Sequence, residues 1–143
     1  PMQWDAGPGA GFSVSAEDGN LPEPWLPLHS DWQCLNVATQ QEEPGSIYNL
    51  HRCLLQLRRA SPVLTHGEYR ALDGTPAAVY GYLREYGGER LLVLLNFEGK
   101  PKEVTAVGFD YGEVLLSTAL DRDGAEGLDP LVLRPHEGVI IRV

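Results

Sequence analysis

Histidines and cysteines are the residue types in this chain most suited to metal binding. The chain contains four histidines, at His29, His51, His66 and His136. A zinc site needs three or four ligands at close spacing. Only the segment His29-Ser30-Asp31 approaches such a pattern, and no further ligand follows it at a suitable distance. The sequence therefore predicts no metal site.

Nucleophilic catalysis requires a serine or cysteine beside a histidine and a third, orienting group. Cys53 and His51 lie two positions apart on a predicted helix, so their side chains point to different faces. No Gly-x-Ser-x-Gly turn is present. The glycine-rich segment 7–11 resembles a phosphate-binding loop but lacks the Lys-Ser/Thr pair that contacts phosphate and magnesium. We therefore expect no cofactor.

Paired carboxylates are harder to judge because the chain has 20 acidic residues. Glu42 and Glu43 precede a predicted helix, where they favour the positive end of its dipole. A second group, in a turn-rich segment, meets only half of a calcium-loop pattern, and a solvated acidic loop explains it more simply. Its members are Asp121, Asp123, Glu126 and Asp129. The residues by themselves indicate no catalytic constellation.

Composition narrows the class of protein. The chain has 143 residues, of which 43% are hydrophobic and 22% are charged, as in folded globular proteins. Its formal net charge is −9, which disfavours nucleic acid and anionic membranes as partners because both attract basic surfaces. No apolar run approaches the roughly 20 residues that a membrane span needs. These features predict a folded acidic protein.

The expected compartment is the cytoplasm. The segment 1–5 shows no basic region followed by an apolar stretch, as a signal peptide would. Two cysteines, Cys34 and Cys53, are too few for a disulfide scaffold. We expect two reduced, buried thiols, and a disulfide between them is the less favoured alternative.

The first part of the chain, residues 1–45, is predicted to be irregular because glycines and prolines interrupt it repeatedly. It nevertheless carries several large aromatic residues, which disordered segments avoid. These are Trp4, Phe12, Trp25 and Trp32. Long loops of this kind are usually functional, and we expect this one to rest on a folded surface.

Residues 44–60 are predicted to form one amphipathic helix. Pro44 suits its first turn, and Ser61-Pro62 ends it. One apolar stripe recurs at helical spacing, with His51 expected as a packing histidine within it. The stripe consists of Ile47, Leu50, His51, Leu54 and Leu57.

From Gly67 onward the hydrophobic pattern alternates with a period of two, which predicts strands. Residues 91–95 are apolar on both faces and should form a central strand, and Gly87-Gly88 indicates a hairpin. The predicted strands span 67–72, 77–86, 90–97, 102–107, 112–118, 130–134 and 138–143. The expected fold class is mainly β: a small antiparallel β-sandwich preceded by a long loop and one helix.

The opening segment Pro1-Met2-Gln3-Trp4-Asp5, followed by Ala10-Gly11-Phe12 and Pro24-Trp25, is distinctive. It resembles the segment after the eighth barrel strand in α-glucosidases and oligo-1,6-glucosidases of glycoside hydrolase family 13. The likeness extends over the whole chain, through the β-sandwich that closes these enzymes. It continues at Asn36-Val37, Pro44-x-Ser46-Ile47, Leu54-x-x-Leu57-Arg58, Tyr80-x-Tyr82 and Leu92-Val93-x-Leu95-Asn96-Phe97.

This resemblance implies a (β/α)₈-barrel enzyme that hydrolyses α-glucosidic bonds with retention, using two carboxylates. In the family those carboxylates precede the Pro-Met-Gln-Trp motif, so the resemblance assigns no catalytic residue here. Residues 1–62 would be the last barrel loop and helix, and residues 63–143 the β-sandwich. The insertion around Glu17-Asp18-Gly19-Asn20 departs from the family spacing.

The resemblance also implies a sugar-contacting role for four residues that border the substrate mouth: Gln3, Trp4, Asp5 and Phe12. The simpler alternative is that Trp4 and Phe12 only pin the loop to the barrel.

Three functions remain open at the level of sequence. The first is an α-glucosidase part that is inactive alone and meets its α-linked oligosaccharide through a barrel. The second is a free-standing β-sandwich that binds sugars through exposed tryptophans. The third is an interaction domain that forms homo-oligomers, or binds a barrel chain, through the stripe of the 44–60 helix.

Overall fold

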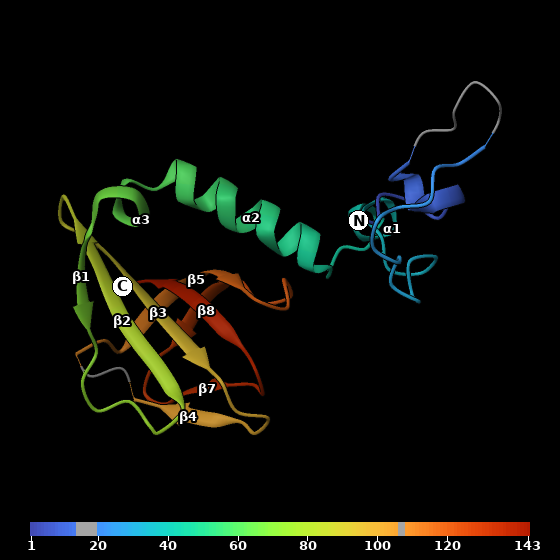
Figure 1. Cartoon of the computed structure of the whole chain (residues 1–143). Coiled ribbons are helices and arrows are strands. Elements are labelled where there is room, and N and C mark those ends of the chain that lie inside the picture. The colour runs from blue at the N-terminus through green and yellow to red at the C-terminus, as the bar shows by residue number, and fades with distance from the viewer. Residues whose placement is uncertain (14–19, 106–107) are drawn as a thin grey trace. The chain divides into compact units, whose positions relative to one another are not determined.

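A computed structural model describes residues 1–13, 20–105 and 108–143 (Figure 1). The chain forms two compact units, Pro1–His51 and Arg52–Val143. The division falls within helix α2 (Ile47–Ala60), and the functional boundary expected after residue 62 stays a prediction. Residues 17–19 of the expected insertion lie outside the described residues. No helix in the described ranges is long and apolar enough to cross a membrane.

The first unit contains two short helices that the sequence did not predict, η1 (Pro8–Gly11) and α1 (Val37–Glu42). Helix α1 begins at Asn36, whose side-chain oxygen accepts a hydrogen bond from the backbone N–H of Thr39 at 2.9 Å. The amide nitrogen of Asn36 donates to the carbonyl of Trp32 at 3.0 Å. Asn36 is buried, so one side chain both caps α1 and holds the preceding turn.

Helix α2 begins later than predicted, at Ile47 rather than at Pro44. Ser46 accepts a hydrogen bond from the backbone N–H of Asn49 at 3.1 Å and thereby caps the first turn. The side-chain nitrogen of Asn49 donates to the carbonyls of Gln40 and Glu43 at 3.0 and 2.7 Å. The connection between α1 and α2 is therefore closed by buried side chains rather than by a proline in the first turn.

The helix stripe starts at exposed side chains, and the expectation of two buried thiols is wrong. His51 is exposed, with Nδ1 lying 3.2 Å from the carbonyl oxygen of Ile47. Ile47 itself is 68% exposed, so the start of the predicted stripe does not pack within the described residues. Cys34 and Cys53 are free as expected, but Cys34 is exposed and Cys53 is only half-buried.

The second unit consists mainly of antiparallel β-structure, as predicted. One sheet has six strands in the order β1-β2-β3-β8-β5-β6, and a smaller sheet pairs β4 with β7. All of these pairs are antiparallel (Figure 1). The strands are β1 (Glu68–Ala71), β2 (Val79–Tyr86), β3 (Glu89–Asn96), β4 (Lys102–Val104), β5 (Tyr111–Ser117), β6 (Gly124–Gly127), β7 (Leu131–Leu133) and β8 (Gly138–Arg142).

The central strand is the one that the sequence indicated. Strand β3 lies between β2 and β8, and residues 91–94 are buried on both faces. The hairpin between β2 and β3 turns at Gly87 and Gly88, whose φ angles are 61° and 87°. Because a two-residue turn of this hand needs positive φ at both positions, two glycines suit it.

The hydrophobic core lies between the two sheets. The large sheet contributes alternate residues from β2, β3, β5 and β8, and the small sheet contributes residues from β4 and β7. This alternation explains why a period of two predicted the fold class. The buried cluster comprises Val79, Leu83, Leu92, Leu94, Val104, Val114, Leu128, Leu131, Leu133, Val139 and Ile141.

The other face of the large sheet is partly covered by α3 (Pro62–His66), which packs against β2 and β3. Ser61 and Pro62 end α2 as expected, but they also begin α3: the Ser61 side chain accepts from the N–H of Leu64 at 3.4 Å. Val63 is buried, and its carbonyl accepts from Nε of Arg84 at 3.4 Å.

The segment expected to be a solvated acidic loop contains strand β6 and an ion-pair network. Arg134 forms two hydrogen bonds of 2.7 Å with the carboxylate of Asp121. Both Arg134 and Arg122 also contact the buried carboxylate of Glu137, at 2.7 and 3.1 Å, and Arg122 pairs with Glu126. Asp121, Glu126 and Glu137 are therefore paired with arginine.

We expect Leu94→Ala to lower the free energy of unfolding by about 2–5 kcal/mol, because it leaves a cavity in a fully buried site. Val132→Ala is the matched control on β7: Val132 is 47% exposed, and its truncation should cost less than about 0.5 kcal/mol. Denaturant unfolding measures both variants. Equal losses of unfolding free energy in the two variants would contradict the placement of Leu94 in the hydrophobic core.

The ion-pair network should make stability depend on acid pH. The hydrogen bonds from Arg134 lower the pKa of Asp121 to about 2. Burial alone would raise the pKa of Glu137, but hydrogen bonds from Arg134 and the charge of Arg122 lower it below its usual value of 4.5. A carboxyl whose pKa is lower in the folded state stabilises the protein above its unfolded pKa, and this contribution is lost as the pH falls.

The unfolding free energy of the wild type should decrease as the pH falls from 4.5 to 2. We expect this decrease to be smaller in Glu137→Gln. Glu103→Gln, at an exposed position on β4, should leave that loss as in the wild type. Denaturant unfolding at a series of pH values measures both slopes, and identical slopes in the two variants would contradict the role given to Glu137.

Candidate functional site

The candidate site is the opening turn of the first unit, built from Trp4, Asp5 and Ala10. The backbone N–H groups of Trp4 and Asp5 donate to the carbonyl of Ala10 at 2.8 and 3.3 Å. The Asp5 carboxylate accepts from the N–H of Gly7 at 2.7 Å. A side chain on Gly11 would collide with that carboxylate, and Gly11 has a φ of 64°. The position of the Asp5 carboxylate therefore depends on the N–H group of Gly7 and on the absence of a side chain at Gly11.

The turn is attached to helix α1 through backbone hydrogen bonds. The N–H groups of Val37 and Ala38 donate to the carbonyls of Gln3 and Trp4 at 3.0 and 2.9 Å. These donors belong to the first turn of α1, where N–H groups have no partner within the helix. The Asn36-Val37 motif therefore positions the Gln3-Trp4 motif, although more than 30 residues separate them.

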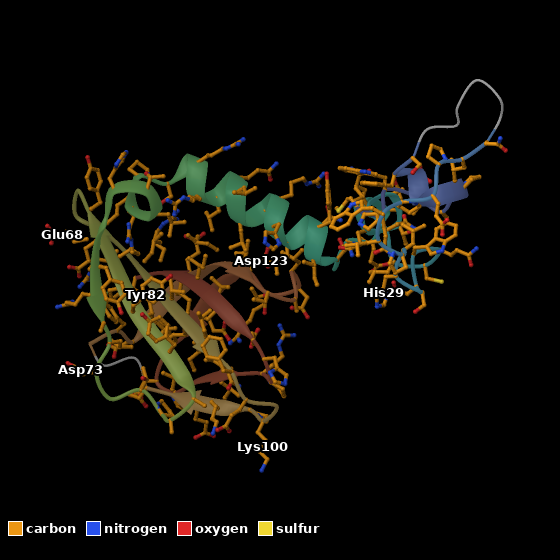
Figure 2. The ribbon with its side chains drawn as sticks, viewed as in Figure 1. His29, Glu68, Asp73, Tyr82, Lys100 and Asp123 are labelled. Atoms are coloured by element: carbon orange, nitrogen blue, oxygen red, sulfur yellow. The ribbon has the colours of Figure 1, made fainter. Side chains whose placement is uncertain are left out.

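A polar cluster that the sequence did not predict surrounds Gln3. Its side-chain amide donates to Oδ1 of Asp31 at 3.4 Å, and Nδ1 of His29 lies 2.5 Å from the same oxygen. The hydrogen bond from His29 lowers the pKa of the Asp31 carboxyl. His29 is labelled in Figure 2. The sequence showed His29 and Asp31 as an incomplete metal motif, and only the fold brings Gln3 to them.

A groove of about 360 Å³ lies beside this cluster. Its walls come from the opening segment, from α1 and the residues before it, and from the first turns of α2. Several of these side chains, including Met2, Leu35 and Ile47, are about half-exposed or more. The lining residues are Met2, Gln3, Leu35, Asn36, Val37, Gln40, Ile47, Tyr48 and His51.

The four residues expected to contact sugar differ in their surroundings. Gln3 lines the groove, whereas Trp4 and Phe12 are 50% and 41% exposed. Asp5 has one carboxylate oxygen engaged by the turn. The turn therefore offers accessible aromatic rings and amide or carboxylate groups, which can stack on a sugar and bond to its hydroxyls. Their contact with sugar stays a prediction.

No group of three or more metal-binding side chains occurs within the described ranges.

We expect Gly11→Ala to open the turn, because the added methyl meets the Asp5 carboxylate at a backbone conformation that alanine resists. The Trp4 amide, which donates to Ala10, should then exchange with solvent at least about tenfold faster. Gly45→Ala is the control, since its new methyl has no neighbour within 4 Å. Unchanged protection of Trp4 in Gly11→Ala would contradict this role.

Comparison with known proteins shows which enzymes the chain is similar to. Residues 1–67 match the alpha amylase catalytic domain. The whole chain aligns with 25% of the oligo-1,6-glucosidase of Parageobacillus thermoglucosidasius, at 30% identity over 146 residues. The chain is therefore similar to part of the enzymes of the alpha-amylase family. Its likeness to the oligo-1,6-glucosidase branch, expected from the opening motif, is thereby confirmed.

Two further relatives agree with this assignment. The oligo-1,6-glucosidase of Halalkalibacterium halodurans is 35% identical over 143 residues, which cover 96% of this chain and 24% of that protein. The solved trehalulose synthase MutB from Pseudomonas mesoacidophila MX-45 matches with a TM-score of 0.83 and 31% identity, covering 99% of this chain and 24% of MutB. The chain thus spans about a quarter of the length of these alpha-amylase relatives, and it matches their C-terminal part.

Proposed function

We propose that this chain serves as the C-terminal part of an α-glucosidase-type hydrolase that cleaves α-glucosidic bonds in oligosaccharides. It completes the rim of the sugar-binding mouth and supports the barrel, and the catalytic carboxylates come from the remaining three quarters of the enzyme. The observation that carries this proposal is the alignment of the entire chain with one quarter of an oligo-1,6-glucosidase.

The burial pattern of the first unit supports this role. Ala10 is the only fully buried apolar residue among its described positions, and the other buried side chains there are polar: Asn36, Ser46 and Asn49. Several of its larger apolar side chains are substantially exposed, including Trp25 at 84% and Ile47 at 68%. Contiguous exposed apolar surface is typical of a contact with further polypeptide. We propose that barrel residues cover this surface, rather than a second copy of the chain.

Gln3, Trp4, Asp5 and Phe12 would lie at the rim of the mouth. Trp4 and Phe12 present partly exposed rings, which suit stacking on a leaving-group sugar, and Gln3 presents an amide to its hydroxyl groups. Asp5 would act mainly by shaping the turn, because its carboxylate already bonds to Gly7. These residues bind and orient the substrate in this proposal, and none of them transfers a proton.

A chimera tests the proposal. We expect that the Parageobacillus oligo-1,6-glucosidase, with its matching quarter replaced by these 143 residues, hydrolyses isomaltose. The same enzyme truncated to remove that quarter should be inactive, and so should the 143-residue chain alone. A folded chimera without activity, or activity of the truncated enzyme, would contradict the proposal. Hydrolysis is measured by glucose release.

Within an active chimera, Trp4→Ala should raise KM about tenfold with little change in kcat, because it removes binding that substrate and transition state share. Phe97→Ala is the control: Phe97 is also an exposed ring, at 67%, but belongs to the second unit. Equal KM values for the chimera and its Trp4→Ala variant would favour the alternative in which Trp4 only anchors the loop.

A second function is favoured by the 84% exposure of Trp25. In this alternative the chain is a non-catalytic carbohydrate-binding module, with Trp4, Trp25 and Trp32 stacking on sugar rings. It predicts sugar binding that Trp25→Ala abolishes, together with an inactive chimera.

A further inference from the structure

Three tyrosines gather on one face of the large sheet, at its β1 edge. Tyr80 and Tyr82 are two positions apart on β2, and Tyr69 comes from β1, opposite Arg84. All three side chains therefore project from the face that lies away from the core residues Val79 and Leu83. Tyr82 is labelled on this part of the second unit in Figure 2.

The three rings contact one another. The ring centroids of Tyr69 and Tyr82 lie 5.3 Å apart, and those of Tyr80 and Tyr82 lie 5.7 Å apart. The hydroxyl oxygens of Tyr69 and Tyr80 are 2.8 Å apart and share a hydrogen bond. Tyr69 and Tyr80 are nevertheless 51% and 48% exposed. The cluster is thus preorganised, and about half of the surface of Tyr69 and of Tyr80 is accessible to solvent.

The chemistry of the cluster indicates a neutral, hydroxyl-rich ligand. Tyrosine rings offer apolar surface for the C–H face of a sugar, and their hydroxyl groups can bond to its oxygens. The rings are tilted by 36° and 51° relative to one another, so they do not form one flat platform. Flat β-1,4-linked chains suit coplanar rings, whereas α-linked glucan chains curve. The net charge of −9 disfavours anionic sugars.

We propose that Tyr69, Tyr80 and Tyr82 form a surface binding site for α-linked glucan chains. The choice of an α-linked sugar rests on the proposed function, but the site itself rests on the ring geometry. Its effect would be to hold a polymeric or branched substrate on the second unit of the protein.

Affinity electrophoresis of the full 143-residue chain tests the site, in native gels that contain soluble starch, dextran or hydroxyethylcellulose. We expect starch or dextran to retard the chain and hydroxyethylcellulose, a β-linked glucan, to leave its mobility unchanged. Tyr69→Ala/Tyr80→Ala should weaken the retardation at least about tenfold in apparent Kd. Circular dichroism checks that each variant is folded.

Two control variants define the site. Tyr111→Ala removes a tyrosine that is 77% exposed on β5, and it should be retarded like the wild type. Tyr69→Phe/Tyr80→Phe keeps the rings and should retain most of the binding even if the alanine pair fails to fold. Absence of retardation in the wild type, or equal weakening by Tyr111→Ala, would overturn the proposal.

The chimera separates this proposal from the proposed function. Tyr69→Ala/Tyr80→Ala in the chimera should leave isomaltose hydrolysis unchanged, since isomaltose is too short to need a second site. If the pair abolishes chimera activity and leaves glucan binding intact, a protein surface covers the tyrosines and the site is overturned. If the chimera is inactive but the chain still binds glucan through these tyrosines, the site stands and the proposed function fails.

Titration provides a check on the cluster in solution. The hydrogen bond from Tyr80 raises the pKa of Tyr69 above its usual value of 10.0. Tyr80→Phe should therefore lower the midpoint of Tyr69 ionisation, followed by tyrosinate absorbance. A midpoint unaffected by Tyr80→Phe would show that the two hydroxyl groups are not hydrogen-bonded in solution, which would contradict the geometry on which the proposal rests.

Discussion

Strand β3 imposes the main constraint on the second unit. Because residues 91–94 are buried on both faces, the sheet must be covered from two sides. The small sheet of β4 and β7 supplies one cover, with the hydrophobic core between the sheets. Helix α3 supplies part of the other, with Val63 buried and Arg84 bonded to its carbonyl.

The first unit is stabilised in a different way. Its described residues contain almost no buried apolar side chain, and its geometry depends on hydrogen bonds from Asn36, Asn49 and the Asp5 carboxylate. Such bonds fix a local shape but contribute little net stability. A unit with a well-defined shape and an exposed apolar surface is suited to contact with a larger protein. This is the physical reason for preferring the role of an enzyme part over that of an independent module.

Glucan binding by the tyrosine cluster would add a function that does not depend on the first unit. The rings lie on β1 and β2, whereas Gln3 and Trp4 belong to the opening turn. A site on the β-sandwich would increase the local concentration of a long substrate, and the turn would select among its ends. In these two proposals the sheet would bind a polymer, and the turn would contact a leaving-group sugar.

The sequence by itself determined the β-structure, the central strand, the Gly87-Gly88 hairpin and the likeness to oligo-1,6-glucosidases, because these depend on local alternation, turn chemistry and a contiguous motif. Predictions from the sequence were wrong or missing where a feature depends on contacts between residues that are far apart along the chain. The start of α2 depends on Ser46 and Asn49 meeting the end of α1, and the polar cluster depends on Gln3 meeting Asp31. The acidic segment was misjudged because Arg134 reaches Asp121 only in the folded chain. Tertiary structure decided these features because hydrogen bonds and ion pairs require atoms within about 3 Å, which spacing along the chain does not reveal.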